Sequence, residues 1–192
     1  SDGVLFRSRI WKLLRGIFGN ELPAAIDLEV VRELLNQPAF GKGESLKKPI
    51  AFDAENFEGA LVRNSDRHDE WGIFYKPRPK CPERERFTIA HEFGHYALHR
   101  ELRTSFECSE SDVSGQTELD IERQADAFAS TLLMPLDDLR RQVDGQRFDF
   151  ELIKHCADRY GVSLTAAARQ CAPDRGQQCG PAGPGRTGPV SP

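Results

Sequence analysis

The segment His-Glu-Phe-Gly-His at residues 91–95 holds the densest chemistry in the chain. On an α-helix, side chains four residues apart lie on one face, so His91 and His95 can bind a single metal ion through their imidazoles. Glu92 follows His91 directly and can accept a proton from a water molecule beside that ion. Zinc is the expected metal, because two imidazoles and a carboxylate suit it and leave a position for water.

A catalytic zinc site needs a third protein ligand, and the residues just after the motif do not supply one. The extended pattern HExxHxxGxxH fails, because Leu98 and Glu101 stand where its glycine and last histidine would be. His99 lies one turn beyond His95, but about 12 Å along the helix axis from His91. We therefore expect His99 behind a ligand or at the surface, not on the metal.

A later segment offers acidic candidates for the third ligand. Glu122 and Asp126 are one helical turn apart, so Glu122 could bind the metal while Asp126 holds a ligand histidine by its second nitrogen. Spacing alone leaves a solvated acidic face as an equal alternative. Glu118 and Asp120 compete with Glu122 for the same role.

Apolar spacing indicates the elements that must position these side chains. Apolar residues at helical intervals predict one helix from about 85 to 99 and another from 118 to 133, which Pro135 ends. Shorter helices are expected at 26–35, 150–159 and 164–170, and strands at 50–52, 59–63 and 71–75. The last two strands form a hairpin, and residues 40–49 and 101–118 are expected to be irregular.

Composition and charge restrict the class of protein. With 192 residues, 39% of them hydrophobic and 29% charged, the chain suits one globular domain and a tail. A formal net charge of -4 gives no general attraction to nucleic acid, so direct DNA binding is not expected. No apolar stretch reaches the roughly 18 residues that a membrane span needs. Five cysteines without a CxxC pair favour free thiols in a reducing cytoplasm.

The chain divides into four parts by pattern. Residues 1–22 have apolar side chains at helical spacing among basic ones, which predicts an amphipathic helix packed on the domain. Residues 23–135 contain the motif and form the core, and 136–170 form a helical segment packed on it. Ten of the residues in 171–192 are Gly or Pro, so this tail is expected to be disordered. Whether a DNA-binding module precedes Ser1 is open.

Three blocks of sequence together resemble one known family. Residues 84–95 (RERFTIAHEFGH), 122–129 (ERQADAFA) and 132–135 (LLMP) strongly resemble the ImmA/IrrE family of zinc metallopeptidases. The resemblance implies an α+β, compact zincin-like domain, in which a small, mainly antiparallel sheet packs on several helices. It also implies Glu122 as the third ligand and Glu92 as the general base. Phe93 and Asp126 replace the commoner Leu and Asn, and neither change removes a ligand.

The same resemblance implies a function. Members of the family are typically bacterial or phage proteins, several of which cut helix-turn-helix repressors, and some act in toxin-antitoxin-like pairs. We therefore expect a cytoplasmic endopeptidase with Zn²⁺ as cofactor, whose substrate is a repressor-type protein encoded nearby.

A regulatory binding protein is the principal alternative. Zinc would then be structural, and residues 150–170, with a turn at 160–163, have the outline of a helix-turn-helix that engages DNA or a transcription factor. This segment is poor in basic residues, so its docking on the core is favoured. Glu92 also favours catalysis, since a structural zinc site does not need it.

Two further roles are open from the sequence. Residues 71–75 are a candidate for an exposed sheet edge to which a substrate adds as a strand, although an ordinary core strand is equally compatible. Tyr96 could stabilise the negative charge that develops on the scissile carbonyl oxygen, but a packing or surface role is favoured.

Overall fold

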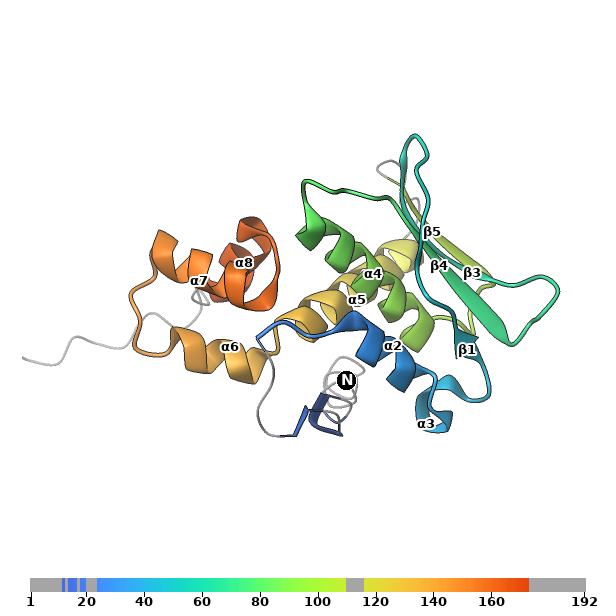
Figure 1. Cartoon of the computed structure of the whole chain (residues 1–192), viewed down its shortest axis with the longest axis horizontal. Helices are drawn as coiled ribbons and strands as arrows, with labels where there is room; N and C mark the ends of the chain where they lie inside the picture. The colour runs from blue at the N-terminus through green and yellow to red at the C-terminus, as the bar shows by residue number, and fades with distance from the viewer. Residues whose placement is uncertain (1–11, 13, 17, 20–23, 110–115, 173–192) are drawn as a thin grey trace, which may run out of the picture.

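The computed structural model describes residues 12, 14–16, 18–19, 24–109 and 116–172. Within these residues the helices lie on one side of a small sheet, and both layers contribute to one apolar core (Figure 1). The longest helices, α4 (Pro82–Leu98) and α5 (Gln116–Leu133), pack against each other, and α4 also contacts β3 and β4 of the sheet. This is the α+β, zincin-like arrangement that the family resemblance implies.

The sheet is open and mainly antiparallel. It contains β1 (Ser45–Leu46), β2 (Ile50–Ala51), β3 (Phe57–Arg63), β4 (Glu70–Tyr75) and β5 (Ser105–Ser109). The strand order is β1-β4-β3-β5, and β2 also pairs with β4. The predicted hairpin is formed by β3 and β4, with Leu61 opposite Ile73, and β5 pairs antiparallel with the other side of β3. The two-residue strands β1 and β2 pair parallel with β4.

The structure decides one open alternative about the strands and corrects two expectations. Of the two alternatives for residues 71–75, the strand is a core strand and not a sheet edge, because β4 pairs with β3 on one side and with β1 and β2 on the other. The segment 101–118 is not irregular, since it contains β5 and the start of α5. β5 carries one large apolar side chain, Phe106, among small and polar residues, so it has no alternating pattern. Residues 40–49 likewise contain β1.

The close approach of α4 and α5 depends on small residues. A Cβ atom on Gly94 of α4 would lie 3.0 Å from Ala125 Cα and 3.1 Å from the Ala125 carbonyl oxygen on α5. The two backbones therefore touch where neither helix has a large side chain. α5 buries its periodic apolar positions, including Ala129 and Leu132. The approach brings the side chains at 91 and 95 within reach of the side chain at 122.

The shorter helices begin at capping residues. Asp27, Asp149 and Ser163 each accept a backbone N–H at the starts of α2 (Leu28–Leu35), α7 (Phe150–Tyr160) and α8 (Leu164–Cys171). Gly161 ends α7 in the left-handed conformation, with φ of 62°. These three helices are predicted by the sequence. The helices α3 (Pro38–Gly41) and α6 (Leu136–Val143) are not, because they are short and lack a long apolar repeat.

The ends of the chain are described only in part. Residues 12, 14–16 and 18 are helical, and Leu14 is buried in the core. The rest of the predicted helix at 1–22 lies outside the described residues. Cys171, the first residue of the expected tail, is instead the buried last residue of α8, and residues 173–192 lie outside the description. Within the described ranges, no helix combines the length and apolar character needed to cross a membrane.

A buried carboxylate joins α6 to α7. Asp138 accepts hydrogen bonds from Arg141 at 2.9 Å, from Arg159 Nε at 3.0 Å and from the Tyr160 hydroxyl at 2.8 Å. Its own side chain is only 4% exposed. Burial raises the pKa of Asp138, but the three hydrogen bonds and the Arg159 charge outweigh burial and bring the pKa below its usual value.

Replacing Asp138 with alanine is expected to lower the free energy of unfolding by about 2 kcal/mol, because three donors lose their acceptor. The loss is not larger because both arginines are partly exposed and can bind water instead. The folded-state pKa of Asp138 lies below the unfolded value, so its contribution is complete above about pH 4 and is lost as pH falls through the folded-state pKa. Urea unfolding at about pH 7 and about pH 3 measures both effects. Asp137→Ala, which removes a more exposed pair with Arg140, is the matched control. Equal losses in the two variants would contradict this role.

Candidate metal centre

Three side chains from α4 and α5 converge on one point. The Nε2 atoms of His91 and His95 are 2.9 Å apart. Glu122 Oε2 lies 3.1 Å from His91 Nε2, and Glu122 Oε1 lies 3.4 Å from His95 Nε2. Within the described part of the chain, these two histidines and one glutamate form a group that could hold a metal ion. Their ligand atoms all lie within 4.8 Å of one another.

The donor set fits a zinc ion. In a tetrahedral site with bonds of about 2.0–2.1 Å, ligand atoms lie roughly 3.3 Å apart, close to the separations between these three side chains. Asp126 Oδ1 lies 2.9 Å from His91 Nδ1. A carboxylate only accepts, so this contact places the proton of a neutral His91 on Nδ1 and leaves the Nε2 lone pair toward the other two ligands.

Burial and hydrogen bonding set the charges of these groups. Burial lowers the pKa of His95, whose side chain has no exposed surface, and so favours the neutral imidazole. Burial raises the pKa of Glu122, but the adjacent His91 and His95 rings outweigh burial and lower the pKa overall. Two neutral imidazoles and an ionised carboxylate are the forms that bind a divalent metal.

The competing acidic residues point elsewhere. Glu118 pairs with Arg103 at 2.7 Å, and Asp120 lies 3.7 Å from Arg123.

Tyr96 is fully buried, and its hydroxyl donates to the Glu44 carbonyl oxygen at 3.2 Å. Tyr96 therefore has the packing role that the sequence favours.

Glu92 lies against the backbone of β3. Its side chain is fully buried, and a Cβ atom on Gly59 would lie 2.8 Å from Glu92 Oε1 and 2.6 Å from Thr88 Cγ2. Gly59 is not among the site residues predicted from the sequence, although a glycine inside a predicted strand is a signal of close backbone approach. The absence of a side chain at Gly59 makes room for the Glu92 carboxylate.

Phe106 of β5 is a second residue that the sequence analysis missed. Its ring stacks on the His95 imidazole with centroids 4.7 Å apart and an interplanar angle of 15°. This contact places the edge strand β5 beside the metal centre. No sequence signal pointed to it, because β5 itself was expected to be irregular.

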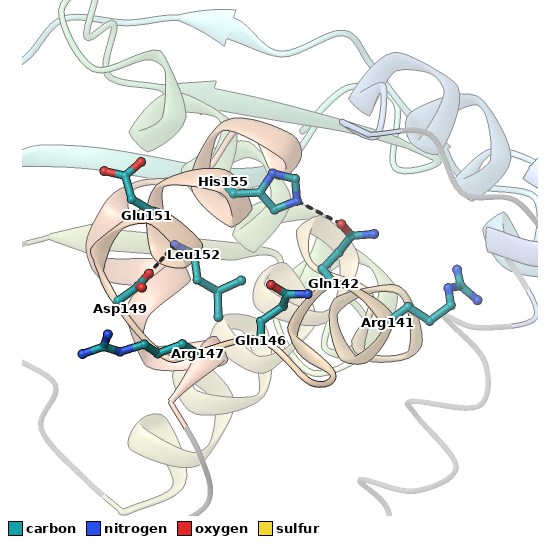
Figure 2. Close-up of a pocket in the computed structure, with 8 residues that line it drawn as sticks. All are labelled: Arg141, Gln142, Gln146, Arg147, Asp149, Glu151, Leu152 and His155. Atoms are coloured by element: carbon teal, nitrogen blue, oxygen red, sulfur yellow. Dashed lines mark hydrogen bonds between the residues drawn. The ribbon is translucent and has the colours of Figure 1, made fainter.

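The polar pocket between α6 and α7 is separate from this centre. It has a volume of about 550 Å³, and His155 and Gln142 are hydrogen bonded across it at 2.9 Å (Figure 2). None of the converging residues of α4 and α5 lines it.

An α+β domain in which two helices bring two imidazoles and a carboxylate together, beside a buried glutamate, has the form of a metallopeptidase. The model of a peptidase family, the IrrE N-terminal-like domain, matches residues 50–171 of the chain. The match covers more than half of the sequence and includes all of α4 to α8. The chain therefore belongs to this peptidase family. A comparison with curated proteins gave no match.

Proposed function

We propose that the protein is a zinc-dependent endopeptidase in which His91, His95 and Glu122 bind the metal and Glu92 is the general base. The observation that carries the proposal is the convergence of three ligand atoms within 4.8 Å. Membership of a peptidase family supports hydrolysis of a peptide bond as the reaction. Asp126, 2.9 Å from His91 Nδ1, supports the orientation of that ligand.

The metal and Glu92 have separate roles in the proposed reaction. A bound zinc ion would supply Lewis acidity, which polarises the scissile carbonyl and lowers the pKa of water to about 7. Glu92 accepts a proton from the attacking water as its oxygen bonds to the carbonyl carbon. Glu92 then donates that proton to the amine nitrogen as the C–N bond breaks. Gly59 keeps the Glu92 carboxylate in place by letting β3 pack against it.

The edge of the sheet offers a site for an extended substrate. β5 pairs with β3 on one side, and no strand in the described part of the chain pairs with its other side. A peptide could therefore add to β5 through main-chain hydrogen bonds. Phe106 of β5 stacks on His95, so a peptide on this edge would pass beside the metal. β5 thus replaces residues 71–75 as the candidate substrate edge.

The proposed substrate is a helix-turn-helix repressor encoded near the gene, in a cytoplasmic pair that could be toxin-antitoxin-like. This part of the proposal rests on the resemblance of the sequence blocks alone. The test is incubation of the zinc-loaded protein with the adjacent repressor, followed by mass spectrometry of the products. We expect one or few cuts, prevention by a chelator, and weak cleavage of casein, because selectivity needs contacts beyond the metal. Binding without cleavage would favour the regulatory alternative.

Replacing Gly59 with alanine is expected to reduce repressor cleavage about 100-fold, because a displacement of the general base by about 1 Å can cost that much. Zinc content should be unchanged, since no ligand is touched. Gly72→Ala is the matched control, because a Cβ atom there would meet the Phe74 ring at 3.5 Å and the Val62 carbonyl oxygen at 4.0 Å, which are ordinary van der Waals contacts. Full activity of the Gly59 variant would show that Glu92 does not depend on this contact.

A further inference from the structure

A third imidazole and an amide continue the hydrogen-bond chain beyond the metal centre. His99 Nδ1 lies 3.2 Å from His95 Nδ1, and His99 Nε2 lies 3.3 Å from Gln124 Oε1 on α5. His99 is 3% exposed. From these contacts we infer that His99, held by Gln124, is a positioning residue that fixes the tautomer in which His95 binds metal. This inference rests on the proposed function.

The direction of the hydrogen bonds between His95, His99 and Gln124 follows from which atoms can donate. The Gln124 amide oxygen only accepts, so His99 Nε2 carries the hydrogen of a neutral imidazole. His99 Nδ1 is then an acceptor and takes the hydrogen of His95 Nδ1. A neutral His95 with its proton on Nδ1 has a lone pair on Nε2, which faces His91 Nε2 at 2.9 Å. The opposite tautomer would place a hydrogen where the metal must bind.

The two ligand histidines are held in the tautomer with the proton on Nδ1 by different hydrogen-bond acceptors. His91 donates to the carboxylate of Asp126, whose side chain is 59% exposed. His95 donates to a neutral ring that is almost fully buried. Water cannot readily replace a buried acceptor, so loss of His99 would leave His95 Nδ1–H without its hydrogen bond. Stacking on Phe106 holds the plane of the His95 ring but cannot select its tautomer.

The test compares His99→Leu with His99→Asn, because the asparagine oxygen can occupy the place of Nδ1 as an acceptor whereas leucine cannot. Zinc affinity is measured by competition with a chelating dye. The His95 tautomer of the metal-free protein is read by long-range ¹⁵N–¹H NMR. We expect the leucine variant to lose about 10- to 100-fold in zinc affinity and the asparagine variant to stay close to wild type. Metal-free wild type should carry the His95 proton on Nδ1.

Several outcomes would overturn the inference. A His95 proton on Nε2 in the metal-free wild type is one such outcome, and an unchanged zinc affinity in His99→Leu is another. If His99→Leu does not fold, Gln124→Leu and Gln124→Glu replace it, since Gln124 is exposed and its loss should not unfold the chain. Gln124→Leu should weaken zinc binding and Gln124→Glu, which keeps an acceptor, should not; equal affinities would contradict the inference. Loss of zinc binding in Glu122→Ala alongside unchanged affinity in the His99 variants would leave the proposed centre standing and reject only the role of His99.

Discussion

Glu92→Gln is expected to retain zinc and to lose repressor cleavage by about 10³-fold in kcat, within the range that general acid–base catalysis contributes. Glutamine keeps the size of the side chain and its place against Gly59, but it cannot accept the proton of the attacking water. The loss should therefore appear in kcat and kcat/KM together, because the interaction is made only in the transition state. Zinc content by elemental analysis and single-turnover cleavage rates are the two measurements.

Glu83→Gln is the control for this experiment. Glu83 lies in the first turn of the same helix, so the substitution makes an equal change of charge away from the metal centre. It should leave both zinc content and cleavage near wild type. A Glu92→Gln variant that keeps full regulatory activity in cells would instead support the binding-protein alternative, in which the metal is structural.

The sequence predicts the parts of the site that depend on local spacing. His91 and His95 are one helical turn apart on a helix with clear ends, and Glu122 and Asp126 repeat that spacing on the next helix. A helix fixes such relations within a few residues of the chain, whatever the rest of the fold does. Spacing alone leaves the pairing of the two helices as one of two equal alternatives, and the resemblance to a known family favours it.

The sequence does not predict the contacts that come from distant segments. β5 has a single large apolar residue, so neither the strand nor the stacking of Phe106 on His95 has a local signature. The packing of Gly59 on Glu92 joins a strand to a helix more than 30 residues away. The link from Gln124 to His99 depends on how α4 and α5 cross. These contacts are set by tertiary packing, and single-residue patterns carry little information about it.

Glu122→Ala is expected to weaken zinc binding by more than about 100-fold, beyond the effect of residues that only orient a ligand. Two imidazoles would remain, but the carboxylate that balances the metal charge would be gone. The added stability that zinc gives the folded wild type, about 2.7 kcal/mol when free zinc is 100 times its dissociation constant, should fall close to zero at the same zinc concentration. Dye competition and thermal unfolding with and without zinc measure the two effects.

Glu118→Ala and Asp120→Ala are the matched controls for the third ligand. Each removes a carboxylate from the same helix, but these groups pair with Arg103 and Arg123 and lie apart from the converging histidines. Both variants should therefore bind zinc like the wild type. If either of them loses zinc while Glu122→Ala keeps it, the third ligand is assigned to the wrong residue. We expect only Glu122→Ala to lose zinc, because Glu122 lies 3.1 and 3.4 Å from the two imidazoles.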